Sequence, residues 1–156
     1  MKKFLLTLML VVTAQWVFGQ SAQAVFDDYK NEKKARFISV PRTQMSIAAQ
    51  MMKENNMKAL LQEVKSLKVL TLGDCRKGIR KGFAKKIINL SKYGYEEFTR
   101  VKDDKDNMLV LVKRGVRYIE EVVLLVSDGD DCTGIFVTGD INPEDIEAII
   151  DISGNY

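Results

Sequence analysis

Acidic side chains near the C-terminal end of the chain are the residues best suited to chemistry. Carboxylate oxygens at alternating positions of a turn can bind calcium, and two carboxylates facing each other across a cleft can hydrolyse a glycoside. The spacing does not fit a twelve-residue calcium loop, because no glutamate occupies its twelfth position. Asp-Gly is also an ordinary hairpin turn, and acidic residues stabilise the start of a helix. We therefore assign structural roles to this group, which consists of Asp128, Asp130, Asp131, Asp140, Glu144 and Asp145.

The remaining side chains do not assemble into a known catalytic motif. The chain contains no histidine, which is the commonest general base. It has no G-x-S-x-G elbow for a serine nucleophile, and no base is evident for a cysteine nucleophile. The sequence therefore predicts a protein that is not an enzyme, with no catalytic residues, no cofactor and no metal site. A small hydrolase that uses its acidic residues is the third hypothesis for function.

Cys75 and Cys132 are the only cysteines of the chain. In an oxidising compartment such a pair can form a disulfide, which would stabilise the fold by roughly 4 kcal/mol because it closes a long loop. Alternatively, both are buried thiols that pack as small apolar side chains. The spacing leaves both alternatives open. Zinc binding by the pair is not expected, because a chain without histidine lacks the usual further ligands.

Five basic residues lie on one side of a predicted helix, opposite an apolar stripe of Ile79, Phe83 and Ile87. A basic amphipathic helix can lie on an anionic membrane or on lipopolysaccharide. The alternative, which we favour, is a solvated face whose lysine stems cover the edge of the core. The candidate contact residues for an anionic surface are Arg76, Lys77, Arg80, Lys81 and Lys85.

Two further patterns fit packing better than ligand binding. Gly78 and Gly82 lie one turn apart on the same helix and are expected to permit close approach of a neighbouring element. Methionines can form an adaptable partner surface or a copper site, but core filling is their commoner role, and we expect it here. These methionines are Met45, Met51, Met52 and Met57.

The N-terminus has the layout of a secretory signal peptide, which we assign to residues 1–24. Lys2 and Lys3 give a positive start, and an apolar core at residues 4–17 precedes small and polar residues. The core is too short to span a bilayer, which takes about 20 residues. We therefore expect an exported protein, either periplasmic or secreted. Two cleavage motifs fit, Ala22-Gln23-Ala24 and Val17-Phe18-Gly19.

Removal of the signal peptide changes the charge of the chain. The formal net charge of +3 includes Lys2 and Lys3, and residues 1–24 contain no acidic residue, so +1 remains. A nearly neutral chain has no global field for nucleic acid, which we exclude as a partner. The length of residues 25–156 predicts a single domain.

The apolar patterns predict an α+β domain in which helices pack on a mostly antiparallel sheet, in the order β-α-β-α-β-β-β-β-α. Short connections with turn residues favour antiparallel neighbours. Continuous apolar runs at residues 108–112 and 122–126 predict central strands that are either covered on both faces or paired at the middle of the sheet. The predicted strands are residues 35–40, 67–72, 95–101, 107–114, 116–126 and 132–138; the predicted helices are residues 25–31, 45–52, 60–64, 76–90 and 143–153.

The last predicted helix has the clearest start signal of the chain. Asn142 is the expected cap and Pro143 the first helical residue, followed by an acidic first turn. Ile146, Ile149 and Ile150 give this helix a side to bury. We therefore expect it to be part of the fold.

Residues 37–52, 66–71 and 125–139 carry a resemblance to a known family. An aliphatic strand runs into a Met-rich helix, a second strand reads Ser-Leu-Lys-Val-Leu-Thr, and a strand–turn–strand segment leads to Asp145 and Ile146. Together these segments resemble the exported family from Bacteroidota that is catalogued as domain of unknown function 4252. Many members resemble lipoproteins with a cysteine at the cleavage site, which this chain lacks. The resemblance implies an exported envelope protein with one α+β domain, and it transfers no functional residues.

These observations predict an exported, non-catalytic envelope protein that serves as a binding or accessory module. Its expected partner is an envelope protein or ligand that the sequence does not identify. The alternative is a peripheral module on a membrane surface that acts through the basic helix.

Overall fold

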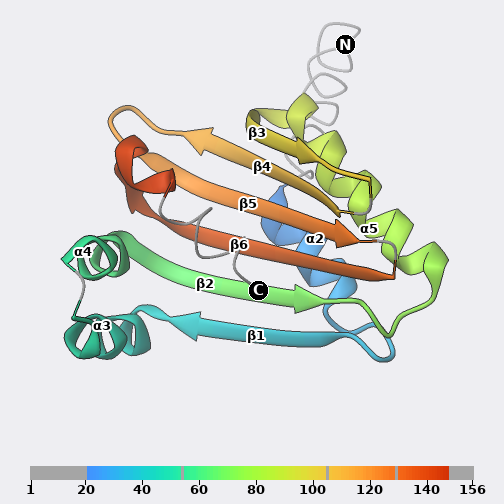
Figure 1. Cartoon of the computed structure of the whole chain (residues 1–156), viewed down its shortest axis with the longest axis horizontal. Helices are drawn as coiled ribbons and strands as arrows, with labels where there is room; N and C mark the ends of the chain where they lie inside the picture. Colours follow the sequence, from blue (N-terminus) through green and yellow to red (C-terminus); the bar gives the residue numbers. More distant parts are fainter. Residues whose placement is uncertain (1–20, 54, 105, 129, 148–156) are drawn as a thin grey trace, which may run out of the picture.

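Six strands form one antiparallel sheet. The strands are β1 (Arg36–Pro41), β2 (Val64–Thr71), β3 (Glu96–Lys102), β4 (Asp106–Arg114), β5 (Ile119–Asp128) and β6 (Asp131–Ile141). Their order across the sheet is β1-β2-β6-β5-β4-β3 (Figure 1). This structure is a computed structural model that describes residues 21–53, 55–104, 106–128 and 130–147, with only the backbone at residues 55–57.

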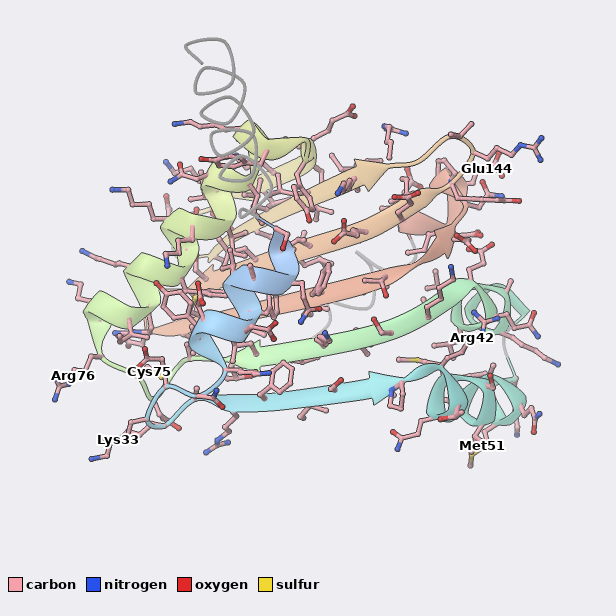
Figure 2. All side chains as sticks on the ribbon, turned by 180° about the vertical axis from the view of Figure 1, so that it is seen from behind. Lys33, Arg42, Met51, Cys75, Arg76 and Glu144 are labelled. Carbon is pink, nitrogen blue, oxygen red and sulfur yellow. The ribbon has the colours of Figure 1, made fainter. Side chains whose placement is uncertain are left out.

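The helices lie on one face of the sheet and at one end of it. Seen from behind, α2 and α5 lie in front of the sheet (Figure 2), whereas α3 and α4 lie at one end of β1 and β2 (Figure 1). The helices are α2 (Ala22–Tyr29), α3 (Arg42–Met51), α4 (Asn55–Glu63) and α5 (Lys77–Asn89), and two short 3-10 turns are η1 (Leu90–Tyr93) and η2 (Pro143–Asp145). The predicted α+β class is confirmed.

Three phenylalanines form the centre of the core between the sheet and the helices α2 and α5. The ring of Phe26 on α2 lies 5.5 Å from that of Phe83 on α5 and 5.6 Å from that of Phe136 on β6, measured between centroids. Gly134 on β6 makes this possible, because a Cβ there would lie 2.6 Å from the Phe83 ring. Ile87 belongs to the same core, as the apolar stripe predicted.

The opposite face of the sheet carries a second, aliphatic core. Val110, Val122 and Leu124 are fully buried on β4 and β5, which confirms the prediction that these are central strands. Met45 on α3 and Leu60 on α4 pack against them from the end of the sheet. Both sheet faces are therefore apolar, but different elements cover them.

The start of β5 differs from the prediction. The strand begins at Ile119, and Val116, predicted as its first residue, is fully exposed in the preceding turn. The N–H of Gly115 donates to the carbonyl of Tyr118 at 2.8 Å, which closes this turn and keeps Val116 out of the sheet.

The first helix begins earlier than residue 25. The Ser21 hydroxyl accepts a hydrogen bond from the N–H of Ala24 at 3.1 Å and so caps α2. The N–H of Ala22 donates to the hydroxyl of Tyr95 at 3.1 Å, and Ala22 itself is fully buried. Burial raises the pKa of Tyr95 to about 12, so its hydroxyl stays protonated and donates to Glu121. The motif Ala22-Gln23-Ala24 therefore forms the packed first turn of a helix; residues 1–20 of the predicted signal peptide lie outside the described residues.

The end of the chain matches the prediction only in part. Pro143 begins a helical turn as expected, but this turn is a 3-10 turn, and the side chain of Asn142 forms no cap. The Asn142 N–H donates to Glu63 Oε2 at 3.3 Å, which ties this turn to α4. Ile146 is fully buried as predicted, whereas Ile149 and Ile150 lie outside the described residues.

Candidate functional site

Four of the five basic residues that the sequence singled out are exposed along α5. Lys77, Lys81 and Lys85 recur every fourth residue and therefore form one stripe on the helix, which Arg76 precedes at one end (Figure 2). Seven ion pairs occur among the described residues, and none of them includes these four side chains. We call Arg76, Lys77, Lys81 and Lys85 the cationic stripe.

Arg80, the fifth predicted contact residue, does not belong to the cationic stripe. Its side chain is half-buried, and its guanidinium donates to the carbonyl of Asp130 in the β5–β6 turn. Its Nε is buried and has no hydrogen-bond partner among the described residues. Arg80 therefore connects α5 to the sheet, and its prediction as a surface contact is wrong because the helix turns it toward β6.

The sequence analysis missed one basic residue of this helix, Lys86. Its ammonium lies 3.8 Å from the carboxylate of Asp28 and 5.2 Å from the ring centroid of Tyr29, both on α2. Lys86 thus holds two helices together. Only the packing of α2 beside α5 reveals this, because no pattern within α5 distinguishes Lys86 from Lys85.

Cys75 and Cys132 are buried in the same core and are free thiols. Both lie next to Leu72, whose N–H donates to the carbonyl of Cys132 at 2.8 Å and whose carbonyl accepts from the N–H of Cys75 at 3.0 Å. Burial raises the pKa of the Cys75 thiol and raises the pKa of Cys132 to about 11. Both are therefore protonated thiols at neutral pH, which makes them weak nucleophiles. Disulfide formation stays a prediction.

Two of the predicted acidic residues accept backbone hydrogen bonds at the β5–β6 turn. Asp128 Oδ1 accepts from the N–H of Asp131 at 3.0 Å, and Asp131 Oδ1 accepts from the N–H of Cys132 at 2.8 Å. These bonds shape the β5–β6 turn. Among the described residues, no three cysteine, aspartate or glutamate side chains lie close enough to hold a metal ion.

The methionines divide into two kinds. Met45 is buried in the second core, as predicted, whereas the exposed fractions of Met51 and Met52 are 79% and 45%. Core filling is therefore wrong for these two, because α3 packs through Met45 and Ala49 and turns its last residues to solvent (Figure 2). The side chain of Met57 lies outside the described residues.

The two glycines of α5 also differ. A Cβ on Gly82 would lie 2.9 Å from the Tyr29 hydroxyl, so this glycine permits close packing of α2 on α5, as predicted. A Cβ on Gly78 would meet no described atom within 4 Å, so the prediction of close packing at this position is wrong.

A second surface, which the sequence analysis did not single out, lies along β1 and α3. Nine large apolar side chains of the described residues are exposed, and four of them fall within residues 38–52. The exposed fraction is 60% for both Ile38 on β1 and Ile47 on α3. We call Ile38, Ile47, Met51 and Met52 the apolar edge. The sequence analysis predicted a strand at residues 35–40 but made no prediction about the exposure of its side chains.

An open hollow of about 490 Å³ lies where β1 begins, and Lys34, Ala35, Arg36 and Asp74 line it. Arg36 and Asp74 form an exposed ion pair there at 3.4 Å. Lys34 has a left-handed backbone with φ of 73°, which turns the chain from α2 into β1. The hollow is shallow and polar, unlike an enclosed apolar ligand pocket.

A family model matches residues 29–149, which include all six strands. Its description is domain of unknown function 4252. This chain belongs to that family. No curated protein and no solved structure matches the chain.

The family match covers both the cationic stripe and the apolar edge but assigns a role to neither. Among the residues that the structure describes, no helix is long and apolar enough to cross a membrane. The choice between the two surfaces therefore depends on their physical properties.

Proposed function

We propose that this chain is an exported envelope protein that acts by binding a partner protein and does not catalyse a reaction. The observation that carries the proposal is the apolar edge, because four of the nine exposed large apolar side chains among the described residues fall within residues 38–52, on β1, on α3 and directly after α3. Exposed apolar side chains scattered singly need no explanation, whereas a concentration of them is typical of an interaction surface.

The layout of the first 20 residues supports export. A cut after Ala24 would remove Ser21, the cap of α2, and Ala22, which is fully buried and bonded to Tyr95. A cut after Gly19 would leave all described residues in place, with Gln20 as the first residue. We therefore favour Val17-Phe18-Gly19 as the cleavage motif.

N-terminal sequencing of the exported protein tests this step. The sequence should begin at Gln20. A sequence that begins at Val25 would contradict the choice of motif, and an intact Met1 in a membrane fraction would contradict signal-driven export.

Photo-crosslinking in intact cells tests the binding role. A photoreactive residue at position 47 on α3 should give a discrete adduct with an envelope protein. The matched control is position 118, because Tyr118 is also exposed, at 47%, but lies in the turn before β5, which β6 and β2 separate from β1 in the sheet. No adduct at position 47, or an equal adduct at both positions, would contradict the proposal.

The cationic stripe favours a second candidate function, which is contact with an anionic membrane surface. A basic residue near such a surface contributes about 1 kcal/mol, so four cations give weak, salt-dependent attachment. Co-sedimentation with anionic and neutral vesicles tests this function. The double variant Lys77→Glu with Lys81→Glu should abolish binding to anionic vesicles, whereas Lys53→Glu with Lys58→Glu, two exposed lysines outside the stripe, should retain it. Equal binding by both double variants would contradict this candidate.

A further inference from the structure

We propose that the outer strand β1 binds an extended segment of the partner as an added strand, and that this segment has aliphatic side chains in its middle and acidic residues at its ends. The proposal rests on the proposed function, since it assumes that the apolar edge binds a protein. An outer strand offers a row of backbone N–H and C=O groups to such a segment, and neighbouring side chains then select it.

The other outer strand, β3, is protected against such pairing. Its register with β4 shifts between Glu97 and Thr99, which is a bulge. Three of its exposed side chains are charged and already paired, because Arg100 Nε donates to Glu97 Oε1 at 2.9 Å and Glu96 accepts from Arg114 at the same distance. Bulges and charges are the usual means by which proteins block an outer strand.

Strand β1 has no bulge, and its one charged side chain, Arg36, is paired with Asp74 at the first residue of the strand. Its register with β2 runs without a shift from Arg36 opposite Thr71 to Pro41 opposite Ser66. Among the described residues, β2 is its only neighbour in the sheet. Ile38 stands in the middle with an exposed fraction of 60%. Pro41 ends the strand and limits pairing to the residues before it.

The charged residues that flank β1 indicate which kind of partner segment this strand would bind. Residues 33–42 contain Lys33, Lys34, Arg36 and Arg42 and no acidic residue. Lys33 lies at one end of β1 and Arg42 at the other (Figure 2). The open hollow at the first of these ends is lined by Lys34, Ala35, Arg36 and Asp74; Arg36 is paired there with Asp74, so Lys34 is the lining cation without an ion pair among the described residues. An aliphatic segment with acidic ends therefore complements β1 along its whole length.

A second copy of this chain fits β1 less well. In an antiparallel pair of β1 strands, Lys34 and Arg36 of one copy would approach Arg42 of the other. In a parallel pair, each of these cations would lie beside its own equivalent. Both arrangements place like charges together, which disfavours association.

A synthetic peptide tests the proposal. The probe is a fluorescent nonapeptide, Asp-Glu-Val-Thr-Ile-Thr-Val-Glu-Asp, and its control has lysine in place of each acidic residue. Fluorescence anisotropy with the purified exported protein should show binding of the acidic peptide only. The variants Ile38→Lys and Arg42→Glu should each weaken binding at least tenfold, with an unchanged unfolding temperature. The matched control Val101→Lys changes an exposed apolar residue of the other outer strand, β3, with an exposed fraction of 50% against 60% for Ile38, and should change the affinity less than twofold.

The outcomes separate this inference from the proposed function. No binding of the acidic peptide, or equal weakening by Ile38→Lys and Val101→Lys, would overturn the role of β1. The crosslink at position 47 would then still support a partner protein. Self-association of the protein that Ile38→Lys abolishes would also overturn the inference, in favour of a second copy as the occupant.

Discussion

Two adjacent rows of side chains cross the sheet on opposite faces and end differently at β1. On the face that α2 and α5 cover, the row runs through Phe37, Leu70, Gly134, Leu125 and Leu109. Phe37 at its edge is half-buried, and the other four are buried. On the opposite face, the row runs through Ile38, Val69, Ile135, Leu124 and Val110. Here only Leu124 and Val110 are buried, Val69 and Ile135 are half-buried, and Ile38 is 60% exposed.

The difference between the two faces indicates which substitutions should change stability and which should change binding. The face that α2 and α5 cover, which we call the helix face, is buried or half-buried along this row from β4 to β1 and contains the aromatic core. Substitutions there should therefore mainly change the free energy of unfolding. The opposite face becomes progressively more exposed toward β1, so substitutions at its edge should change binding with little effect on stability. This contrast makes predictions for matched pairs of residues.

The largest effect is expected in the aromatic core. Phe83→Ala should lower the free energy of unfolding by about 3–5 kcal/mol, because it leaves a cavity between α5, α2 and β6. Ile88→Ala on the same helix should cost less than about 0.5 kcal/mol, since Ile88 is 42% exposed. Urea unfolding measures both. Similar losses for the two variants would mean that the helix face is not closed as the structure shows.

A disulfide between the two cysteines of the helix-covered core would add to the stability of the whole domain. If Cys75 and Cys132 pair under oxidising conditions, reduction should remove roughly 2–4 kcal/mol and lower the unfolding temperature by several degrees. Mass spectrometry without reductant decides whether the bond exists. Two thiols that alkylate only after unfolding would exclude the bond, and would agree with the burial that raises the pKa of both.

Substitutions of Met45 and Met51 on α3 allow a buried and an exposed side chain of the opposite face to be compared. Met45→Ala should lower the free energy of unfolding by about 2 kcal/mol, at the lower end of the range for buried methionines, whereas Met51→Ala should lower it by less than about 0.5 kcal/mol. The yield of the crosslinked adduct from position 47 should show the opposite pattern. Met51→Ala should lower this yield, whereas Met45→Ala should not. Equal stability losses would contradict the contrast between the two side chains.

The sequence predicted those parts of the fold that depend on local patterns. The apolar stripe of α5, the buried runs of β4 and β5 and the turn residues between strands gave the α+β class and the antiparallel sheet. The position of β1 at the edge was not predictable, because the residues of a strand do not show whether it has one neighbour in the sheet or two. The exposure of Ile38 was therefore not predicted.

The same limit applies to the candidate site. Helical spacing placed Lys77, Lys81 and Lys85 on one exposed stripe, because that spacing is a property of α5 alone. It could not show that Arg80 reaches Asp130 or that Lys86 reaches Asp28, because both contacts join segments far apart in the sequence. Long-range contacts thus decided which cations remain available to a partner.

The smallest expected effect on stability comes from Glu63, the last residue of α4, next to the buried part of the opposite face. Burial raises the pKa of Glu63, and the nearby carboxyl of Asp145 raises it further, although the N–H of Asn142 acts in the other direction. A carboxyl whose pKa is higher in the folded protein binds its proton more tightly there than in the unfolded chain. Its contribution is therefore fully present below the unfolded pKa, near 4.5, and is lost as pH rises through the folded pKa.

Glu63→Gln should remove this loss of stability at higher pH, because glutamine does not ionise. The variant should be more stable than the parent near pH 7 by less than about 1 kcal/mol, and the difference should shrink toward pH 4, where Glu63 is protonated in both states. Thermal unfolding from pH 4 to pH 8 measures the difference. A variant that is less stable at pH 7 would instead mean that the Glu63 bond to Asn142 outweighs the burial of its charge, and that η2 depends on this carboxylate for its position.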